Sequence, residues 1–180
     1  MIGRGLMLLL LPLAAADSVL AEDQRLVVQP SAAQPAQAAF EVTVQLVTED
    51  SLVGTLPGVA FRLCWDEPEV QLGNAQPLAA MPPEGDRALG TAASKQACDL
   101  AESARGIPML WLDPAAQWPA QADELLATVA VQVPEGYEGN IRFWVEDARG
   151  GPDVVFATEQ GTVRFVGDNI FSDRFELTVP

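Results

Sequence analysis

Hydrophobic and polar positions alternate along several short segments of the chain. In the segment 40–48, apolar and polar side chains follow each other almost without exception. A period of two is typical of a β-strand that turns one face towards a core. Strands are predicted in the same way at 22–28, 59–65, 107–112, 125–133, 141–146, 154–157 and 162–166. Helical periodicity is nearly absent, so the pattern predicts an all-β protein.

The region between residues 73 and 103 does not alternate. It is rich in Ala, Gly and Pro and contains the stretch MPPEGD, which predicts a long irregular region with one poor strand and a short helical turn near Ala97–Ala104. Along 125–133, the alternation places Leu125 on one face of the strand and Leu126 on the other. Short strands joined by turn clusters such as PEGYEGN predict an antiparallel sandwich or barrel.

The N-terminus has the three parts of a secretory signal peptide. A positive charge at Arg4 precedes an apolar run at 6–16, and small residues at 19–21 precede the expected cut before Glu22. Cleavage after Ala16 and an uncleaved anchor are the alternatives. No later stretch approaches the roughly 18 apolar residues of a membrane span, so none is expected after cleavage. The predicted divisions are a signal peptide at 1–21, a sandwich at 22–166 and a tail at 167–180.

Export changes the interpretation of the two cysteines, Cys64 and Cys98. In an oxidising compartment two lone cysteines usually pair. Cys64 lies in a predicted strand and Cys98 in the long irregular region, so a disulfide would hold that region against the sheet. Two free thiols are the alternative.

The chain carries 25 acidic and 10 basic residues, a formal net charge of -15. Such a surface repels phosphate backbones, which argues against nucleic acid as a partner. Solubility outside the cell explains the charge, and calcium binding is the alternative. Asp147 and Asp153 bracket the stretch ARGGP without the dense ligand spacing of an EF-hand loop. They are weak calcium candidates, and no other cofactor is expected.

The sequence contains no histidine. This excludes Ser-His-Asp and Cys-His nucleophilic catalysis and every zinc site with a histidine ligand. Catalysis by two carboxylates needs no histidine, yet no stretch marks one pair among the 25 acidic residues. The composition favours a protein that is not an enzyme, with a carboxylate-dependent hydrolase as the catalytic alternative.

Three segments together resemble a cohesin domain. They are FEVTVQLVTEDSLVGTLPGVAFRLCWDEPEVQL, GIPMLWLDPAAQWPAQADELLATVAVQV and IRFWVEDARGGPDVVFATEQGTVRF. The first contains a D-x-P stop after an apolar strand, and the last contains a Q-G-x-V turn. The resemblance covers nearly all of 26–165 and implies an antiparallel jelly-roll β-sandwich of about nine strands. The cysteine-bearing insertion after Asn74 departs from compact cohesins.

Cohesins are best known for binding dockerin modules. The resemblance therefore implies a protein partner, either dockerin-like or from the cell envelope. No residue of this chain is matched to a dockerin contact.

The tail GDNIFSDRFELTVP carries a second, smaller resemblance. It is similar to the I-F-x-D-G-F-E ending of many exported proteins of Gram-negative bacteria, with Arg174 in place of the glycine. This implies a sorting or processing signal and, with the signal peptide, a secreted or periplasmic protein. The alternative is that Phe171 and Phe175 pack a last strand onto the sandwich.

Two of the four tryptophans are predicted to lie in the core, and two are candidates for ligand contact. Trp65 and Trp111 each share a strand face with apolar neighbours. Trp144 alternates outward, and Trp118 lies in a loop. An outward tryptophan is a stacking surface for a sugar ring or a hot spot for a protein. Cover by the region 73–103 is the alternative for both.

Together these features predict a non-catalytic, secreted binding module. The first hypothesis is protein–protein interaction through a sheet face, and the second is polysaccharide binding on exposed tryptophans. An apolar face rimmed by charge would favour the first, and aligned exposed aromatic side chains the second. The ligand-contact candidates are Trp118, Trp144, Arg142 and Glu146.

Overall fold

The computed structural model describes residues 24–31, 39–80, 84–91, 93–101, 103–151, 154 and 156–165. The predicted signal peptide and tail, with Phe171 and Phe175, lie outside these residues. Within the described part of the chain, no helix is long and apolar enough to cross a membrane.

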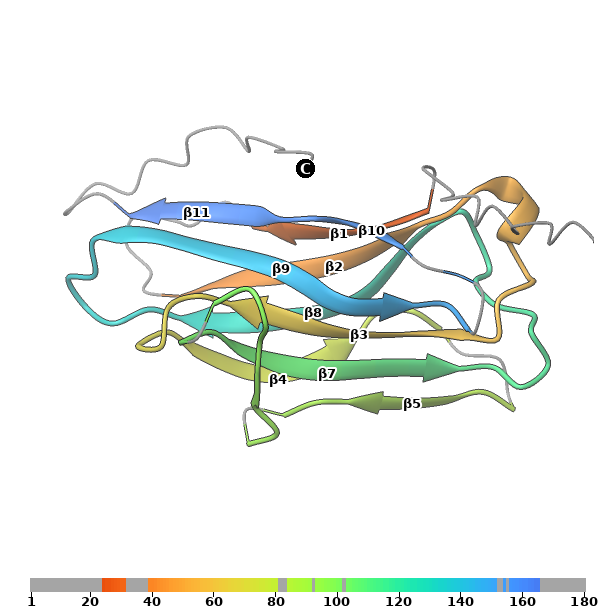
Figure 1. Cartoon of the computed structure of the whole chain (residues 1–180), viewed down its shortest axis with the longest axis horizontal. Coiled ribbons are helices and arrows are strands. Elements are labelled where there is room, and N and C mark those ends of the chain that lie inside the picture. Colours follow the sequence, from red (N-terminus) through yellow and green to blue (C-terminus); the bar gives the residue numbers. More distant parts are fainter. Residues whose placement is uncertain are drawn as a thin grey trace, which may run out of the picture.

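Two β-sheets face each other and form a β-sandwich (Figure 1). One of them, the β2 sheet, has the order β10-β1-β2-β8-β4. Its strands are β10 (Ala157–Glu159), β1 (Arg25–Pro30), β2 (Ala39–Val47), β8 (Asp123–Gln132) and β4 (Gln71–Pro77). The other, the β3 sheet, has the order β11-β9-β3-β7-β5, and β6 also pairs with β7. Its strands are β11 (Gly161–Phe165), β9 (Gly139–Arg149), β3 (Gly58–Trp65), β7 (Arg105–Leu112), β5 (Asp86–Leu89) and β6 (Gln96–Ala97). The short 3₁₀ helix η1 (Asp50–Leu52) precedes β3.

One pair of strands departs from the predicted antiparallel arrangement. At the edge of the β2 sheet, β10 runs parallel to β1, with Ala157 opposite Arg25. The chain then crosses to the β3 sheet at Gln160, and β11 pairs with β9. The closing segment therefore contributes one strand to each sheet, β10 beside β1 and β11 beside β9.

The described residues form eleven strands, where the sequence predicts about nine. The irregular region 73–103 contains the end of β4 together with β5 and β6, both of which pair with β7. Strands of two or four residues are too short for an alternation to be recognised in the sequence. Their position depends on the hydrogen bonds that β7 offers.

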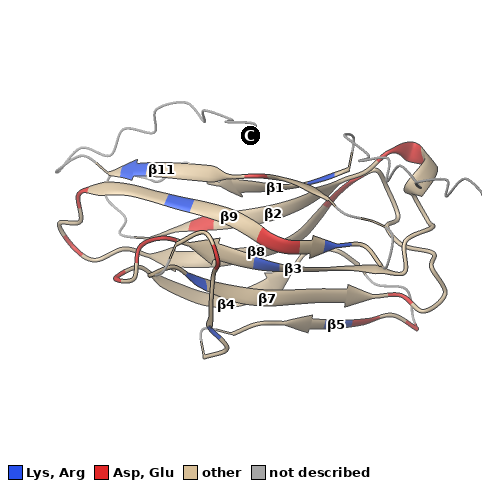
Figure 2. Cartoon of the chain, viewed as in Figure 1, with Lys and Arg blue, Asp and Glu red and all other residues tan. Residues whose placement is uncertain are grey.

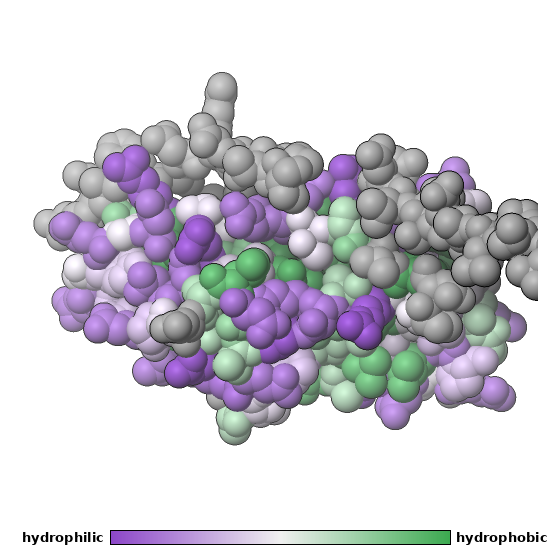
Figure 3. Space-filling model, in the orientation of Figure 1, coloured by the Kyte–Doolittle hydropathy of each residue, from purple (hydrophilic) through white to green (hydrophobic). Residues whose placement is uncertain are grey.

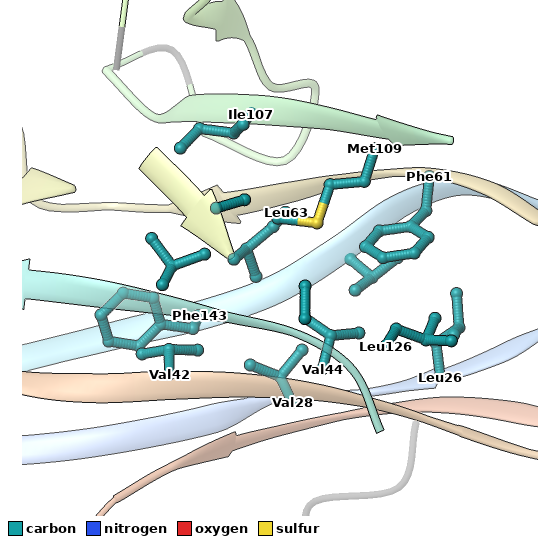
Figure 4. Close-up of a cluster of buried hydrophobic side chains, with 14 of the residues drawn as sticks. Leu26, Val28, Val42, Val44, Phe61, Leu63, Ile107, Met109, Leu126 and Phe143 are labelled. Carbon is teal, nitrogen blue, oxygen red and sulfur yellow. The ribbon is translucent and has the colours of Figure 1, made fainter. Parts of the chain in front are cut away.

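The core fills the space between the two sheets (Figure 4). Val42 of the β2 sheet and Leu63 and Phe143 of the β3 sheet are completely buried. Burying one such side chain stabilises the fold by about 2 kcal/mol. Trp65 and Trp111 expose 1% and 0% of their surface, which confirms the prediction that both lie in the core.

A β-bulge in β8 changes the faces that the alternation predicts. Val44 lies opposite Ala127, whereas the next residue, Gln45, lies opposite Leu125, so Leu126 is an extra residue on β8. As a result Leu126 is completely buried and Leu125 is 46% exposed. The two leucines lie on opposite faces as predicted, but the alternation groups Leu125 with Ala127, whereas it is Leu126 that shares the buried face with Ala127.

Residues 98–104 form a loop, here called the disulfide loop, that lies over the outer face of the β3 sheet. The described residues of the loop adopt bends and turns, and the predicted helical turn at Ala97–Ala104 is wrong. The backbone N–H groups of Asp99 and Leu100 donate to a side chain of β9, Glu146, rather than to helix carbonyls. The loop is thus shaped by the sheet beneath it.

Candidate binding surface

The outer face of the β3 sheet divides into a covered half and an open half. Strand register places Cys64 beside Trp144 in one row, which the disulfide loop covers. Further along the same strands, Ala60, Leu110 and Ala88 form another row across β3, β7 and β5. This second row lines an open groove.

The covered half is held together by a disulfide bond. Cys64 on β3 and Cys98 in the loop are joined, with a distance of 6.3 Å between their Cα atoms, which confirms the predicted pairing. Both cysteines pack with Ala104 and Trp144 in an apolar cluster separate from the core. Gly106 lies beneath the bridge, where a Cβ would come within 2.7 Å of the Cys98 sulfur. Glycine here lets the loop approach the sheet closely.

The carboxylate of Glu146 fixes the loop from below. It accepts hydrogen bonds from the backbone N–H of Asp99 at 2.8 Å, from that of Leu100 at 3.0 Å and from the indole N–H of Trp144 at 2.8 Å. Burial raises the pKa of Glu146, but these hydrogen bonds and the nearby Arg62 guanidinium outweigh burial and hold the pKa below its ordinary value. The carboxylate is therefore ionised at neutral pH.

Arg62 joins the loop to the open half of the face. Its guanidinium donates to the carbonyl of Ala97 and to the carboxylate of Asp147, and its Nη2 lies 3.8 Å from Asp99 and 3.9 Å from Glu146. The Arg62 side chain is only 15% exposed, whereas those of Asp99 and Asp147 are 84% and 54% exposed. Figure 2 shows this acidic stretch of β9 beside a basic position on β3.

The open half forms a groove of about 530 Å³. Ala60, Ala88, Pro108 and Leu110 contribute apolar surface to it, and Arg62 lies at the border with the disulfide loop. Figure 3, which views this face, shows apolar side chains over the β7–β5 pair next to a band of polar ones. An apolar groove with charged side chains at its border is a typical protein-docking surface.

The predicted exposure of Trp118 is wrong, because its side chain is only 1% exposed. Trp118 forms an isolated β-bridge with Leu56, and its peptide bond to Pro119 is cis. The turn before it is closed by the buried carboxylate of Asp113, which accepts hydrogen bonds from the N–H groups of Ala115 and Gln117. The turn folds back onto the sandwich and buries the indole.

Trp144 is buried too, which confirms the alternative for this residue, cover by the region 73–103. Its strand face does point away from the core, but the disulfide loop covers it and leaves 6% of the residue exposed. Glu146 is buried under the same loop, at 9% exposure. Arg142, by contrast, is exposed and pairs with Asp66, with 2.6 Å between Nε and Oδ2. A ligand-contact role for Arg142 remains a prediction.

The weak calcium candidates do not form a site within the described residues. Asp147 is paired with Arg62, and Asp153 lies outside the described part of the chain. One group of possible metal ligands, Cys64, Cys98 and Glu146, lies within 4.8 Å. Because its two sulfurs are bonded to each other, this group offers no thiolate ligand.

A second concavity, of about 670 Å³, lies on the β2 sheet. Val27 and Val47 contribute apolar surface to it, and Gln45 contributes a polar side chain. Arg25 and Glu159 form an ion pair at its border, at 3.1 Å. It contains neither an aromatic side chain nor an unpaired cluster of like charges among its described lining residues, and it therefore indicates no particular ligand.

The sequence analysis did not identify Arg62 or Leu100 as residues of a binding surface. Arg62 is the one charged residue in the apolar strand VAFRLCW, two positions before Cys64. A lone charge at an outward position beside a cysteine is a signal that could have identified it. Leu100 follows Asp99 in an irregular loop, and no periodic pattern distinguishes it.

No protein-family model and no curated protein matches the chain. A solved cohesin module from a family 33 glycoside hydrolase of Clostridium perfringens is similar in structure, with a TM-score of 0.53 at 9% identity. The match covers 79% of this chain and 96% of that module. The chain has a cohesin-like fold.

Two further solved cohesins are more distant from this cohesin-like sandwich. The seventh ScaB type I cohesin of Pseudobacteroides cellulosolvens has a TM-score of 0.46 at 11% identity, over 84% of this chain and 82% of that one. The sixth cohesin of scaffoldin B from Acetivibrio cellulolyticus, solved in complex with a dockerin, has a TM-score of 0.41 at 10% identity, over 77% and 85%.

Proposed function

We propose that this cohesin-like sandwich is a non-catalytic protein-binding module that docks its partner on the outer face of the β3 sheet. The observation that carries the proposal is the groove beside the disulfide loop, where Ala60, Pro108 and Leu110 give apolar surface on rigid strands. Charged side chains at the border then select the partner, because they must be matched when water leaves the interface.

Two alternative functions, polysaccharide binding and carboxylate-dependent hydrolysis, each require a feature that the described residues do not provide. Polysaccharide binding required exposed stacking surfaces, and both Trp118 and Trp144 are buried. A carboxylate-dependent hydrolase needs two carboxylates free to act on a substrate. Three described carboxylates line the two concavities, those of Asp123, Asp147 and Glu159. Asp147 and Glu159 are each paired with an arginine, so the described residues line neither concavity with two carboxylates without an arginine partner.

The first candidate for the partner is a dockerin-type module, the class that the sequence resemblance to cohesins implies. We place this interaction at the cell envelope or outside the cell. The signal-peptide pattern at 1–21 and the disulfide both support export, since disulfides persist in oxidising compartments. No cofactor enters the proposed interaction.

Two exposed leucines on opposite faces test the proposed docking surface. Leu112, at the end of β7, is the next outward residue after Leu110, which lines the groove, and is 45% exposed. Leu125 faces outward from the β2 sheet and is 46% exposed. Because their exposures match, Leu112→Lys and Leu125→Lys change surface chemistry equally on the two faces.

The measurement is the affinity of the full chain for a panel of purified dockerin modules, by biolayer interferometry. Leu112→Lys is expected to weaken binding at least about 10-fold, as a charge introduced into an apolar interface does. Leu125→Lys is expected to leave the affinity unchanged. Equal effects of the two variants would overturn the assignment of the face, and no binding to any module would overturn the dockerin-type partner.

A further inference from the structure

The disulfide loop exposes one large apolar side chain far more than any other described leucine. Leu100 is 77% exposed, compared with 45% to 48% for the other exposed large hydrophobic residues. Single exposed leucines are common on protein surfaces. Leu100 differs from them in the way its backbone is held.

The backbone on both sides of Leu100 is fixed. The N–H groups of Asp99 and Leu100 both donate to Glu146 on β9, and the residue before them, Cys98, is bonded to Cys64 on β3. Because the loop backbone is already fixed, a partner that covers Leu100 does not have to order it, which lowers the entropic cost of binding. Hot spots are more often Trp, Tyr or Arg than Leu, so Leu100 is favoured by its exposure and its anchored backbone and not by its residue type.

Leu100 and the groove belong to one continuous surface. Arg62 connects them, because it lines the groove, donates to the carbonyl of Ala97, the last residue before the loop, and lies 3.8 Å from Asp99 of the loop. The groove also reaches Gln96, which pairs with β7 immediately before the loop. A partner bound in the groove therefore lies next to the exposed side chain of Leu100.

The charges around Leu100 are predominantly acidic. One guanidinium, that of Arg62, lies among three carboxylates, those of Asp99, Glu146 and Asp147, which leaves an excess of two negative charges. No other described cation forms an ion pair with these three carboxylates. The Lys95 ammonium lies 5.5 Å from the centre of the Trp65 ring, and the Arg105 guanidinium donates to the carbonyls of Ser103 and Ala104.

We infer that Leu100 is the hot spot of the docking surface and enters an apolar pocket on a partner protein whose rim carries arginine or lysine. This inference rests on the proposed function and specifies the chemistry of the partner. The exposed carboxylate of Asp99 pairs with the basic rim beside the Arg62–Asp147 ion pair, and Leu100 supplies the apolar contact. The loop thus determines which partner the groove accepts.

The test uses a display library of folded three-helix domains with a randomised face, selected on the full chain. Enriched domains are measured against the wild type and three variants: Leu100→Ser, Leu112→Lys and Leu78→Ser. Leu78, at the end of β4, is 48% exposed and is the matched control for loss of an exposed leucine. Each variant changes a solvent-exposed residue, and the circular dichroism spectrum checks that it folds.

The expected result is that enriched domains combine apolar residues with Arg or Lys and bind Leu100→Ser about 30-fold more weakly, while Leu78→Ser binds as the wild type does. Domains that are lost on Leu112→Lys but retained on Leu100→Ser would overturn the hot spot and leave the proposed docking face intact. Domains indifferent to both variants would overturn both. An enriched set without basic residues would overturn the predicted chemistry of the partner.

Discussion

The Glu146 carboxylate accepts hydrogen bonds from backbone N–H groups of the disulfide loop and from the indole N–H of Trp144 on its own strand. Its protonation state therefore controls how firmly the loop is held. Burial raises its pKa, but three hydrogen bonds and Arg62 hold the pKa below the ordinary value of about 4.3. A lowered folded-state pKa means that the ionised form favours the fold. The stabilisation is present above the ordinary pKa and is lost as the pH falls through the folded-state value.

We predict that Glu146→Gln lowers the free energy of unfolding by about 1–3 kcal/mol at pH 7, because charge-assisted hydrogen bonds become neutral ones. The difference from the wild type is expected to shrink towards pH 3, as the pH falls towards the folded-state pKa and the wild-type carboxylate becomes increasingly protonated. Urea unfolding at both pH values measures this. Glu135→Gln, an exposed position in the β8–β9 turn, is the control. Parallel pH dependences of Glu146→Gln and wild type would contradict the assigned role.

At the level of single residues, the four tryptophans show what alternation can and cannot predict. Trp65 and Trp111 lie in strands whose inner face is set by a period of two, and both are buried as predicted. Trp144 also points where the alternation places it, away from the core. What covers it is a loop 40 or more residues earlier in the chain, and no local pattern encodes that contact. Trp118 is buried by a turn, where alternation does not apply.

Among the elements, the disulfide loop has the most direct consequence for stability. Cys64 and Cys98 are separated by 34 positions, and closing such a loop stabilises a fold by about 4 kcal/mol on the chain-entropy model. We predict that the double variant Cys64→Ser, Cys98→Ser loses about this amount in urea unfolding. The loop is also expected to leave the sheet more often, which exposes Trp144.

Acrylamide quenching of tryptophan fluorescence in the native state detects that exposure. Quenching is expected to increase in the double cysteine variant, since Trp144 is the tryptophan that the loop covers. Adding Trp144→Phe to the double variant should remove the increase and serves as the control. Unchanged quenching, with Trp144 still protected, would mean that Glu146 and Arg62 hold the loop without the bridge.

The strands themselves were predictable in proportion to their length. The long segments around β2, β3, β7, β8 and β9 show clear alternation, and all five form strands near their predicted bounds. The bulge at Leu126 was not predictable, because both Leu125 and Leu126 are apolar and only the register with β2 shows which one is extra. β5, β6 and β10 depend on neighbouring strands for their hydrogen bonds, which no sequence window contains.

For the molecule as a whole, the outline of the sandwich followed from the sequence but its binding surface did not. Alternation and turn spacing gave the all-β class, and the cysteine count gave the bridge that the structure contains. The groove and the exposed Leu100 arise from segments of β3, β5, β7, β9 and the disulfide loop that meet only in the folded chain. Predicting such a surface requires knowledge of the register between neighbouring strands.

The disulfide also connects the fold to the compartment in which the whole molecule forms. Bridges of this kind form in oxidising compartments and are rare in the cytosol. The signal-peptide pattern at 1–21 predicts export to such a compartment. Correct formation of the binding surface should therefore depend on the N-terminal segment.

We predict that the 180-residue chain, expressed in a bacterial host with a periplasm, is recovered from the periplasmic fraction as a protein that begins at Glu22. Its intact mass should be lower by two hydrogens than that of the reduced form, because Cys64 and Cys98 are bonded. A chain that starts at Glu22 without the first 21 residues is the control and should stay in the cytosol with both thiols alkylatable. Recovery of the full chain from the cytosol with Met1 retained and free thiols would contradict export, and with it the proposal that the disulfide loop meets its partner outside the cytosol.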